Sequence, residues 1–166
     1  DMGPSWYWMP DVFEKYFNDF NKKVSDYYNI KKLDPAYTVY FGSNDSIEIK
    51  GDIDSICKTF DEHEKGASKS LKKFMSQANK NYSIAMDKIV YKPGISIFEL
   101  ITFKTITRIR YFLTNIKSEV AKYFKNKKLR QILEFPVLFL GAKPENTPAF
   151  YNIMNHADFG LGTWFP

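Results

Sequence analysis

The stretch Tyr37-Thr-Val-Tyr-Phe-Gly-Ser-Asn-Asp-Ser-Ile-Glu-Ile-Lys50 decides the β part of the fold. Its first five residues are aromatic or β-branched, and residues 46–50 alternate polar with apolar side chains, as a strand with one buried face does. The four residues Gly42 to Asp45 between them are typical of a tight turn. The stretch therefore predicts a β-hairpin near 37–50. We expect an α+β fold that is mostly helical, with a small mixed β-sheet that includes this hairpin.

Helical periodicity dominates on both sides of the hairpin. Before it, apolar residues recur at three- and four-residue steps from Val12 to Tyr28, which predicts one amphipathic helix that starts near Pro10. After it, Asp52 can cap a short helix over residues 53–62. A longer helix follows Gly66 and continues to Ile89, until Pro93-Gly94 ends it.

The C-terminal part is expected to contain a short helix through Leu133, then a buried apolar segment Val137–Leu140. A further helix is predicted from about Pro148 to Ala157, and residues 162–165 are predicted to start a strand. At 166 residues, the chain has the size of one domain. We therefore expect a single domain over 1–166.

Positive charge is concentrated in one part of the chain. Residues 104–130 carry nine Lys or Arg side chains and one acid, Glu119, whereas the whole chain has a net charge of only +5. Residues 96–124 also show the helical period, so 96–130 is predicted to be a basic amphipathic helical subregion. Such a helix suits a bilayer interface. The alternative is a surface helix whose apolar face packs on the core and whose lysines are solvated. Nucleic acid is the third interpretation, and we expect none because base-stacking and base-reading motifs are missing.

Several kinds of chemistry are disfavoured by the sequence. Cys57 is the one cysteine, and the two histidines lie far apart, so neither an internal disulfide nor a metal site is expected. No run of 18 apolar residues occurs. Gly160-Leu-Gly162 is followed by Thr-Trp-Phe-Pro166, which cannot open a helix, so these glycines indicate a turn rather than a phosphate-binding loop. No nucleophile with a base partner stands out, and no catalytic residue is assigned.

Two stretches resemble the bacterial-type phytoene desaturases and related carotenoid desaturases. The first is Asp1-Met-Gly-Pro-Ser-Trp6 leading into Met9-Pro-Asp-Val-Phe13. The second combines Lys127-Lys-Leu-Arg-Gln-Ile-Leu-Glu-Phe135, Leu140-Gly-Ala-Lys-Pro144, Thr147-Pro-Ala-Phe-Tyr151 and Gly162-Thr-Trp-Phe-Pro166. Leu33-Asp-Pro-Ala-Tyr37 is also similar. The order of these motifs supports the resemblance, which is weakest over residues 98–119.

This resemblance implies a fragment of an FAD-dependent enzyme with an amine-oxidase-like architecture. The family's flavin domain is doubly wound and built from both chain ends, and this chain is similar to the central domain that binds substrate and membrane. FAD is then the cofactor of the parent enzyme. The fragment is expected to bind none, because it lacks the glycine fingerprint. Its expected partners are a carotenoid polyene, a membrane surface and the missing flavin-binding domain, with self-association possible. The expected location is cytoplasmic, peripheral to the inner face of the cell membrane.

The resemblance and the aromatic residues together yield two sets of predicted site residues. The predicted walls of the substrate tunnel or flavin edge are Trp6, Trp8, Phe139, Tyr151 and Trp164. The predicted membrane contacts are Phe98, Ile101, Phe112, Lys104 and Arg108. A carotenoid isomerase or oxygenase of the same family, and a non-catalytic lipid-binding or scaffold domain at a membrane surface, remain alternatives.

Overall fold

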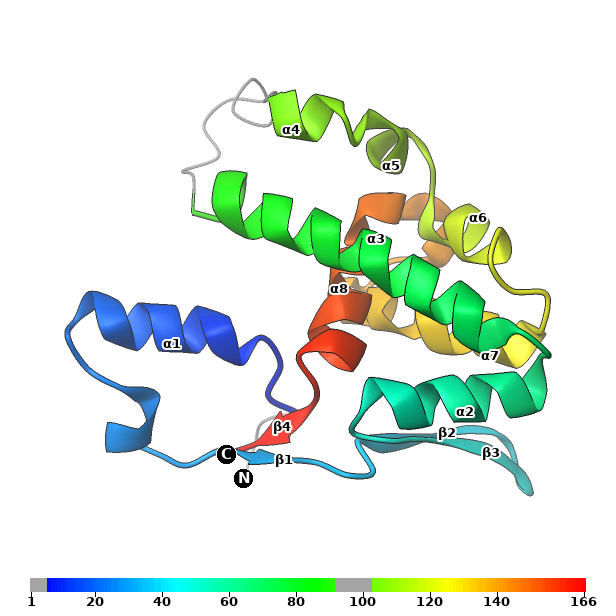
Figure 1. Ribbon diagram of the computed structural model, residues 1–166, viewed down its shortest axis with the longest axis horizontal. Coiled ribbons are helices and arrows are strands. Elements are labelled where there is room, and N and C mark those ends of the chain that lie inside the picture. Colours follow the sequence, from blue (N-terminus) through cyan, green and yellow to red (C-terminus); the bar gives the residue numbers. More distant parts are fainter. Residues whose placement is uncertain (1–5, 92–102) are drawn as a thin grey trace.

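The computed structural model describes residues 6–91 and 103–166. The helices are α1 (Pro10–Asp19), α2 (Ile53–His63), α3 (Ala67–Lys88), α4 (Phe103–Ile106), α5 (Ile109–Leu113), α6 (Ile116–Ala121), α7 (Lys127–Glu134) and α8 (Ile153–Asn155). The short 3₁₀ segments are η1 (Val24–Asp26), η3 (Phe135–Leu140), η4 (Pro144–Asn146) and η5 (Ala149–Asn152), and η6 (His156–Gly160) is a π-helix. The strands are β1 (Lys31–Lys32), β2 (Tyr37–Gly42), β3 (Asp45–Ile49) and β4 (Trp164–Phe165). Figure 1 shows α3 crossing the molecule, with α2 and the β2–β3 hairpin toward one end and α1 toward the other.

The predicted hairpin is confirmed. Tyr37 pairs with Ile49 and Val39 with Ile47, with a bulge between Tyr40 and Gly42. The prediction of one mixed sheet is wrong for the described residues, because their strands form two separate antiparallel pairs, β2 with β3 and β1 with β4. The second pair joins residues 31–32 to 164–165, so the last described strand reaches β1 and not the hairpin.

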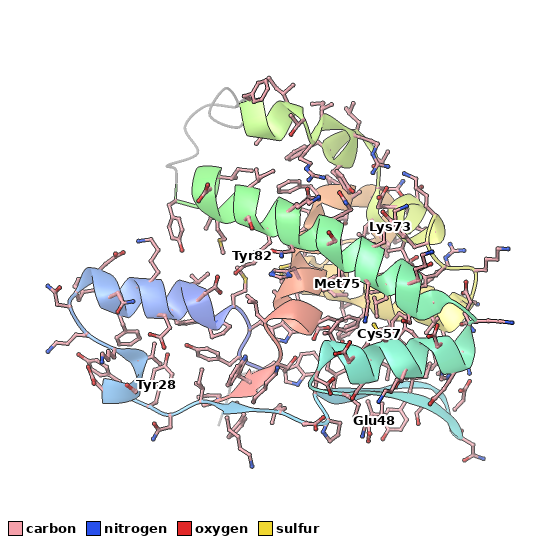
Figure 2. The ribbon with its side chains drawn as sticks, in the orientation of Figure 1. Tyr28, Glu48, Cys57, Lys73, Met75 and Tyr82 are labelled. Carbon is pink, nitrogen blue, oxygen red and sulfur yellow. The ribbon has the colours of Figure 1, made fainter. Side chains whose placement is uncertain are left out.

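The core lies between the inner face of β3 and helices α2, α3, α6 and α7. Its fully buried members include Ile49, Phe60, Leu71, Phe74, Val120, Phe124, Leu129 and Leu133. The predicted helix after Asp52 is confirmed, since the Asp52 carboxylate accepts a hydrogen bond from the Ser55 N–H at 2.9 Å. Figure 2 shows Cys57 and Met75 in the region where α2 and α3 face each other, in agreement with their place in the buried core.

Two of the predicted helices are shorter than expected. The helix predicted to reach Tyr28 ends at Asp19, because Asn21 adopts a left-handed conformation with φ of 55° and the chain turns. The single helix predicted over 96–124 is interrupted within its described residues, where α4, α5 and α6 are separate. Thr114 and Asn115 are extended, and the Asn115 side chain caps α6 by accepting from the Ser118 N–H at 2.8 Å.

The segment Val137–Leu140 was expected to be buried, and this is correct for Val137 alone. Leu138, Phe139 and Leu140 are 66, 53 and 44% exposed, so η3 buries only its first half, Pro136 and Val137. The predicted C-terminal helix is confirmed as a helical run, but it continues through η5, α8 and η6 to Gly160. The predicted strand start is confirmed as β4.

Candidate functional site

Five aromatic side chains from three distant parts of the chain meet at one place, and we call them the aromatic cluster: Trp6, Trp8, Tyr37, Phe135 and Phe139. Trp6 lies in the middle, with its ring centroid 4.9 Å from that of Tyr37 and 5.8 Å from that of Trp8. Phe139 packs 5.1 Å from Trp8 and 5.7 Å from Phe135. The N-terminal segment, β2 and η3 therefore contribute to one aromatic surface.

An open groove of about 370 Å³ continues this surface between β2 and η3. Phe135 belongs to both the cluster and the groove, and Val39, Phe41 and Leu138 supply much of the apolar lining. We call the aromatic cluster and these three residues the apolar strip. An elongated apolar ligand can gain about 25 cal/mol for each Å² of surface that it buries there.

One carboxyl group borders the groove, that of Glu134. Its burial raises the pKa of this carboxyl above the ordinary value. The Arg130 Nε lies 3.9 Å from Glu134 Oε1, a long ion pair. The groove therefore combines mainly apolar walls with a single acidic edge.

The buried carboxylate of Asp158 is linked by hydrogen bonds to two members of the aromatic cluster, Tyr37 directly and Trp8 through Thr163. Asp158, which is 3% exposed, accepts hydrogen bonds from the Tyr37 hydroxyl and from Thr163 Oγ1. Thr163 Oγ1 in turn accepts from the Trp8 indole N–H at 2.7 Å. Burial raises the pKa of Asp158 to about 7, although both hydrogen bonds lower it. Desolvation by burial likewise raises the pKa of the Tyr37 hydroxyl, and the Asp158 charge adds to the effect.

Three of the five predicted wall residues come together in this site: Trp6, Trp8 and Phe139. Trp164 lies in β4, pairs with Tyr7, and donates its indole N–H to the Leu161 carbonyl at 3.0 Å. Tyr151 lies in η5, which packs against α6, α5 and α3 and belongs to another part of the molecule.

Sequence reasoning missed two members of the aromatic cluster, Tyr37 and Phe135. The available signal was positional. Tyr37 opens the hairpin on the same face as Val39 and Phe41, and Phe135 follows α7 directly. Both are aromatic residues at the ends of regular elements, where side chains from several segments can meet.

The predicted membrane contacts are distributed differently. Phe98 and Ile101 lie outside the described residues, as does the side chain of Lys104 in α4. Phe112 stacks on Phe150 with ring centroids 4.4 Å apart, and Arg108 donates to the Gln77 side chain at 2.7 Å. Other residues of α4 and α5 expose apolar side chains, and we call them the α4–α5 face: Phe103, Ile106, Ile109 and Leu113.

Much of the positive charge of residues 104–130 is paired within the protein. Arg110 and Lys122 lie 3.1 and 2.7 Å from the buried carboxylate of Glu119. Three further ion pairs, two of them to acids in other elements, are Lys117–Glu145, Lys128–Asp45 and Arg130–Glu134. The field at the surface is therefore weaker than the sequence count implies.

The described residues do not form the phosphate-binding motif that holds a flavin dinucleotide. Binding of the dinucleotide phosphates requires a parallel strand that leads through a glycine-rich turn into a helix. The described strands are all antiparallel, and Gly162, with φ of 89°, leads into β4 instead.

Within the described parts of the chain, no helix is long and apolar enough to cross a membrane.

The fold and the site define a mostly helical α+β unit with an aromatic-lined apolar strip and an exposed apolar face. No family model matches the chain. A carotenoid 3,4-desaturase of Haloarcula japonica is 40% identical over the whole chain, which covers 34% of that protein. A phytoene desaturase of Phycomyces blakesleeanus is 29% identical over the whole chain, which covers 29% of it. A 4,4'-diapophytoene desaturase of Staphylococcus haemolyticus is 26% identical over 93% of the chain, which covers 31% of that relative.

Over its whole length, the chain is therefore similar to members of the carotenoid desaturase family. It spans about a third of the length of the curated relatives that it matches.

Proposed function

We propose that this chain is the substrate-binding part of an FAD-dependent carotenoid desaturase and that the apolar strip holds the polyene. The observation that supports this most directly is the meeting of Trp6, Trp8 and Phe139 on one surface that continues into the apolar groove. The three relatives above are named for action on carotenoids or their precursors. A surface that is aromatic, mainly apolar and bordered by a single carboxyl group suits such a hydrocarbon.

The chemistry divides between this chain and the rest of the longer protein. A polyene hydrocarbon offers no polar group, so buried apolar area supplies the affinity and shape supplies the selection. This chain's residues would hold the polyene in place and exclude water from it. FAD and the redox step belong, in this proposal, to the parts of the protein outside this chain.

The same proposal places the α4–α5 face against a membrane, at its cytoplasmic surface. Ile109 and Leu113 are more than half exposed, and basic side chains follow closely in the sequence. Phe98, Ile101, Lys104 and Arg108 would extend this contact. An interfacial helix with apolar residues and a cationic rim binds anionic bilayers in this way.

Polyene conversion by the full-length protein tests the main proposal. With FAD and membranes present, the protein is expected to desaturate a C30 or C40 precursor, and Phe139→Ala should raise KM about tenfold through lost contact area. The matched control Val90→Ala removes an exposed apolar side chain outside the strip. Absence of a desaturated product from every such polyene would reject the proposal. An isomerised or hydroxylated product would instead indicate an isomerase or oxygenase.

A non-catalytic lipid-binding domain is the second candidate, and the exposed α4–α5 face favours it. Sedimentation with vesicles examines the membrane contact separately from the redox reaction. Binding is expected to require anionic lipid, to weaken with salt, and to fall severalfold in the double variant Ile109→Ser, Leu113→Ser. Equal binding to neutral vesicles at all salt concentrations would remove the cationic part of the contact.

A further inference from the structure

A second aromatic surface lies on α1 and η1, away from the apolar strip. We call its outward residues the α1 face: Tyr16, Phe20 and Tyr27, which are 60, 63 and 60% exposed. They are held by ring contacts, with 5.2 Å between the centroids of Tyr16 and Phe20 and 4.9 Å between those of Phe17 and Tyr27. Helix α1 itself contributes no buried residue.

The described contacts explain only part of the stability of α1. A ten-residue helix is marginal in water without an apolar face packed against something. Polar contacts hold its inner side, since the Tyr82 hydroxyl donates to the Asp11 carboxylate at 2.9 Å and Lys15 Nζ lies 5.1 Å from the Tyr91 ring centroid. Figure 2 shows Tyr82 on the side of α3 toward α1. The outer aromatic face is left uncovered, which is typical of an interaction surface.

The charge around this face argues against an anionic membrane as its cover. Residues 10–28 contain four acids and three lysines, a net charge of −1, whereas residues 104–130 have a net charge of +8. Helices that lie in an anionic bilayer interface are rich in Lys and Arg. An apolar protein surface fits a weakly charged aromatic face better.

The positions of the chain ends indicate which polypeptide covers the α1 face. Tyr7 and Trp164 pair through two backbone hydrogen bonds of 2.9 and 3.0 Å, so the two ends of the described chain lie together, as Figure 1 shows beside β1 and β4. Tyr7 also joins this edge to α1, with its ring centroid 4.4 Å from that of Phe13. The relatives are about three times as long as this chain. Polypeptide that flanks it in a longer protein would therefore leave from the edge that carries α1.

We propose that the α1 face is the surface on which the rest of the longer protein docks, through an apolar and weakly charged polypeptide surface. This inference rests on the proposed function, in which the chain is one part of a larger desaturase. Burial of Tyr16, Phe20 and Tyr27 would then stabilise α1 and hold this chain against the part that carries FAD.

Hydrogen exchange in the full-length protein, without vesicles, tests the docking. The amides of residues 10–20 are expected to exchange at least about tenfold more slowly than in the double variant Tyr16→Asp, Phe20→Asp. The matched control Tyr40→Asp changes an aromatic that is 74% exposed on the hairpin and should leave this protection unchanged.

Three results would overturn the docking proposal. They are equal exchange in the wild type and the double variant, protection that appears only when vesicles are added, and protection that depends on protein concentration. The second would identify a membrane and the third a second copy of the chain. Protection of α1 in a protein that converts no polyene would reject the proposed desaturase function while supporting the docking surface.

Discussion

At the scale of single residues, Asp158 links the site to pH. Its folded pKa of about 7 exceeds the ordinary value of 3.8 because the carboxyl is buried, so the folded protein binds a proton more tightly than the unfolded chain does. The contribution of Asp158 to stability is therefore fully present below pH 3.8 and is lost as the pH rises through about 7.

We expect the free energy of unfolding to increase as the pH falls from about 8 to about 5, by at most about 1.4 kcal/mol per pH unit for one proton. Urea unfolding at several pH values measures this slope. Asp158→Asn should flatten it, because the buried group no longer titrates. An equal slope in the wild type and the variant would show that other groups cause it.

Glu119 supplies a second prediction at this scale. Its side chain is 1% exposed and depends on Arg110 and Lys122 for compensation of its charge. Replacing both partners by Met should destabilise the protein by about 3 kcal/mol, because a buried carboxylate is left unpaired. Lys72→Met, which removes a solvent-exposed pair with Asp54, should cost less than about 0.5 kcal/mol. Similar losses in the two variants, measured by urea unfolding, would contradict the prediction.

At the scale of elements, the start of α7 is held by side chains from two directions. Asn126 Oδ1 accepts from the Lys128 N–H at 2.9 Å, and its amide donates to the His63 carbonyl at the end of α2. A further link comes from Glu64, whose carboxylate accepts a hydrogen bond from the Asn126 N–H at 2.7 Å. Helices α2 and α7 are therefore connected through their ends as well as through the core.

Asn126→Ala is expected to lower the free energy of unfolding by about 1 to 2 kcal/mol, since the cap and the link to α2 are lost together. Asn29→Ala, at an exposed position outside any helix, provides the control and should change it by less than about 0.5 kcal/mol. Thermal and urea unfolding both measure the difference. Equal values for the two variants would mean that this cap adds no stability.

At the scale of the whole molecule, the single cysteine reports on global opening. Cys57 is buried in the core formed by α2 and α3, and burial raises the pKa of its thiol. We expect a thiol reagent to modify Cys57 at least about 100-fold more slowly in the folded protein than in the urea-unfolded chain. Cys57→Ala shows which part of the signal belongs to this residue. Modification of the folded protein at the unfolded rate would mean that α2 opens readily.

Much of the fold could be predicted because its signals are local. The turn residues 42–45 and the alternation after them specify the hairpin, and Asp52 specifies the start of α2. The two helix boundaries that were predicted wrongly, the end of α1 and the start of α6, depend on single residues whose local preference competes with the helical period. Asn21 takes a left-handed conformation within an otherwise helical pattern, and Asn115 caps a new helix where continuation was expected.

The aromatic cluster was predictable only in part. Trp6, Trp8 and Phe139 were predicted as wall residues and lie in the cluster, whereas Tyr37 and Phe135 were not predicted. Tyr151 was predicted on the same grounds, yet it lies in η5, away from the cluster. Aromatic character shows that a side chain can line an apolar site, whereas its position depends on how distant segments pack.

The sequence by itself indicated the resemblance to the carotenoid desaturases, the mostly helical α+β class and the hairpin, because motifs, propensity and periodicity act over a few neighbouring residues. Only the tertiary structure decided that residues 6, 37 and 139 share one surface, that Asp158 lies beneath it, and that ion pairs offset the charge of residues 104–130. The physical reason is that a local pattern specifies which face of an element is apolar. Which distant element covers that face, or leaves it exposed as on α1, follows from the packing of the whole chain.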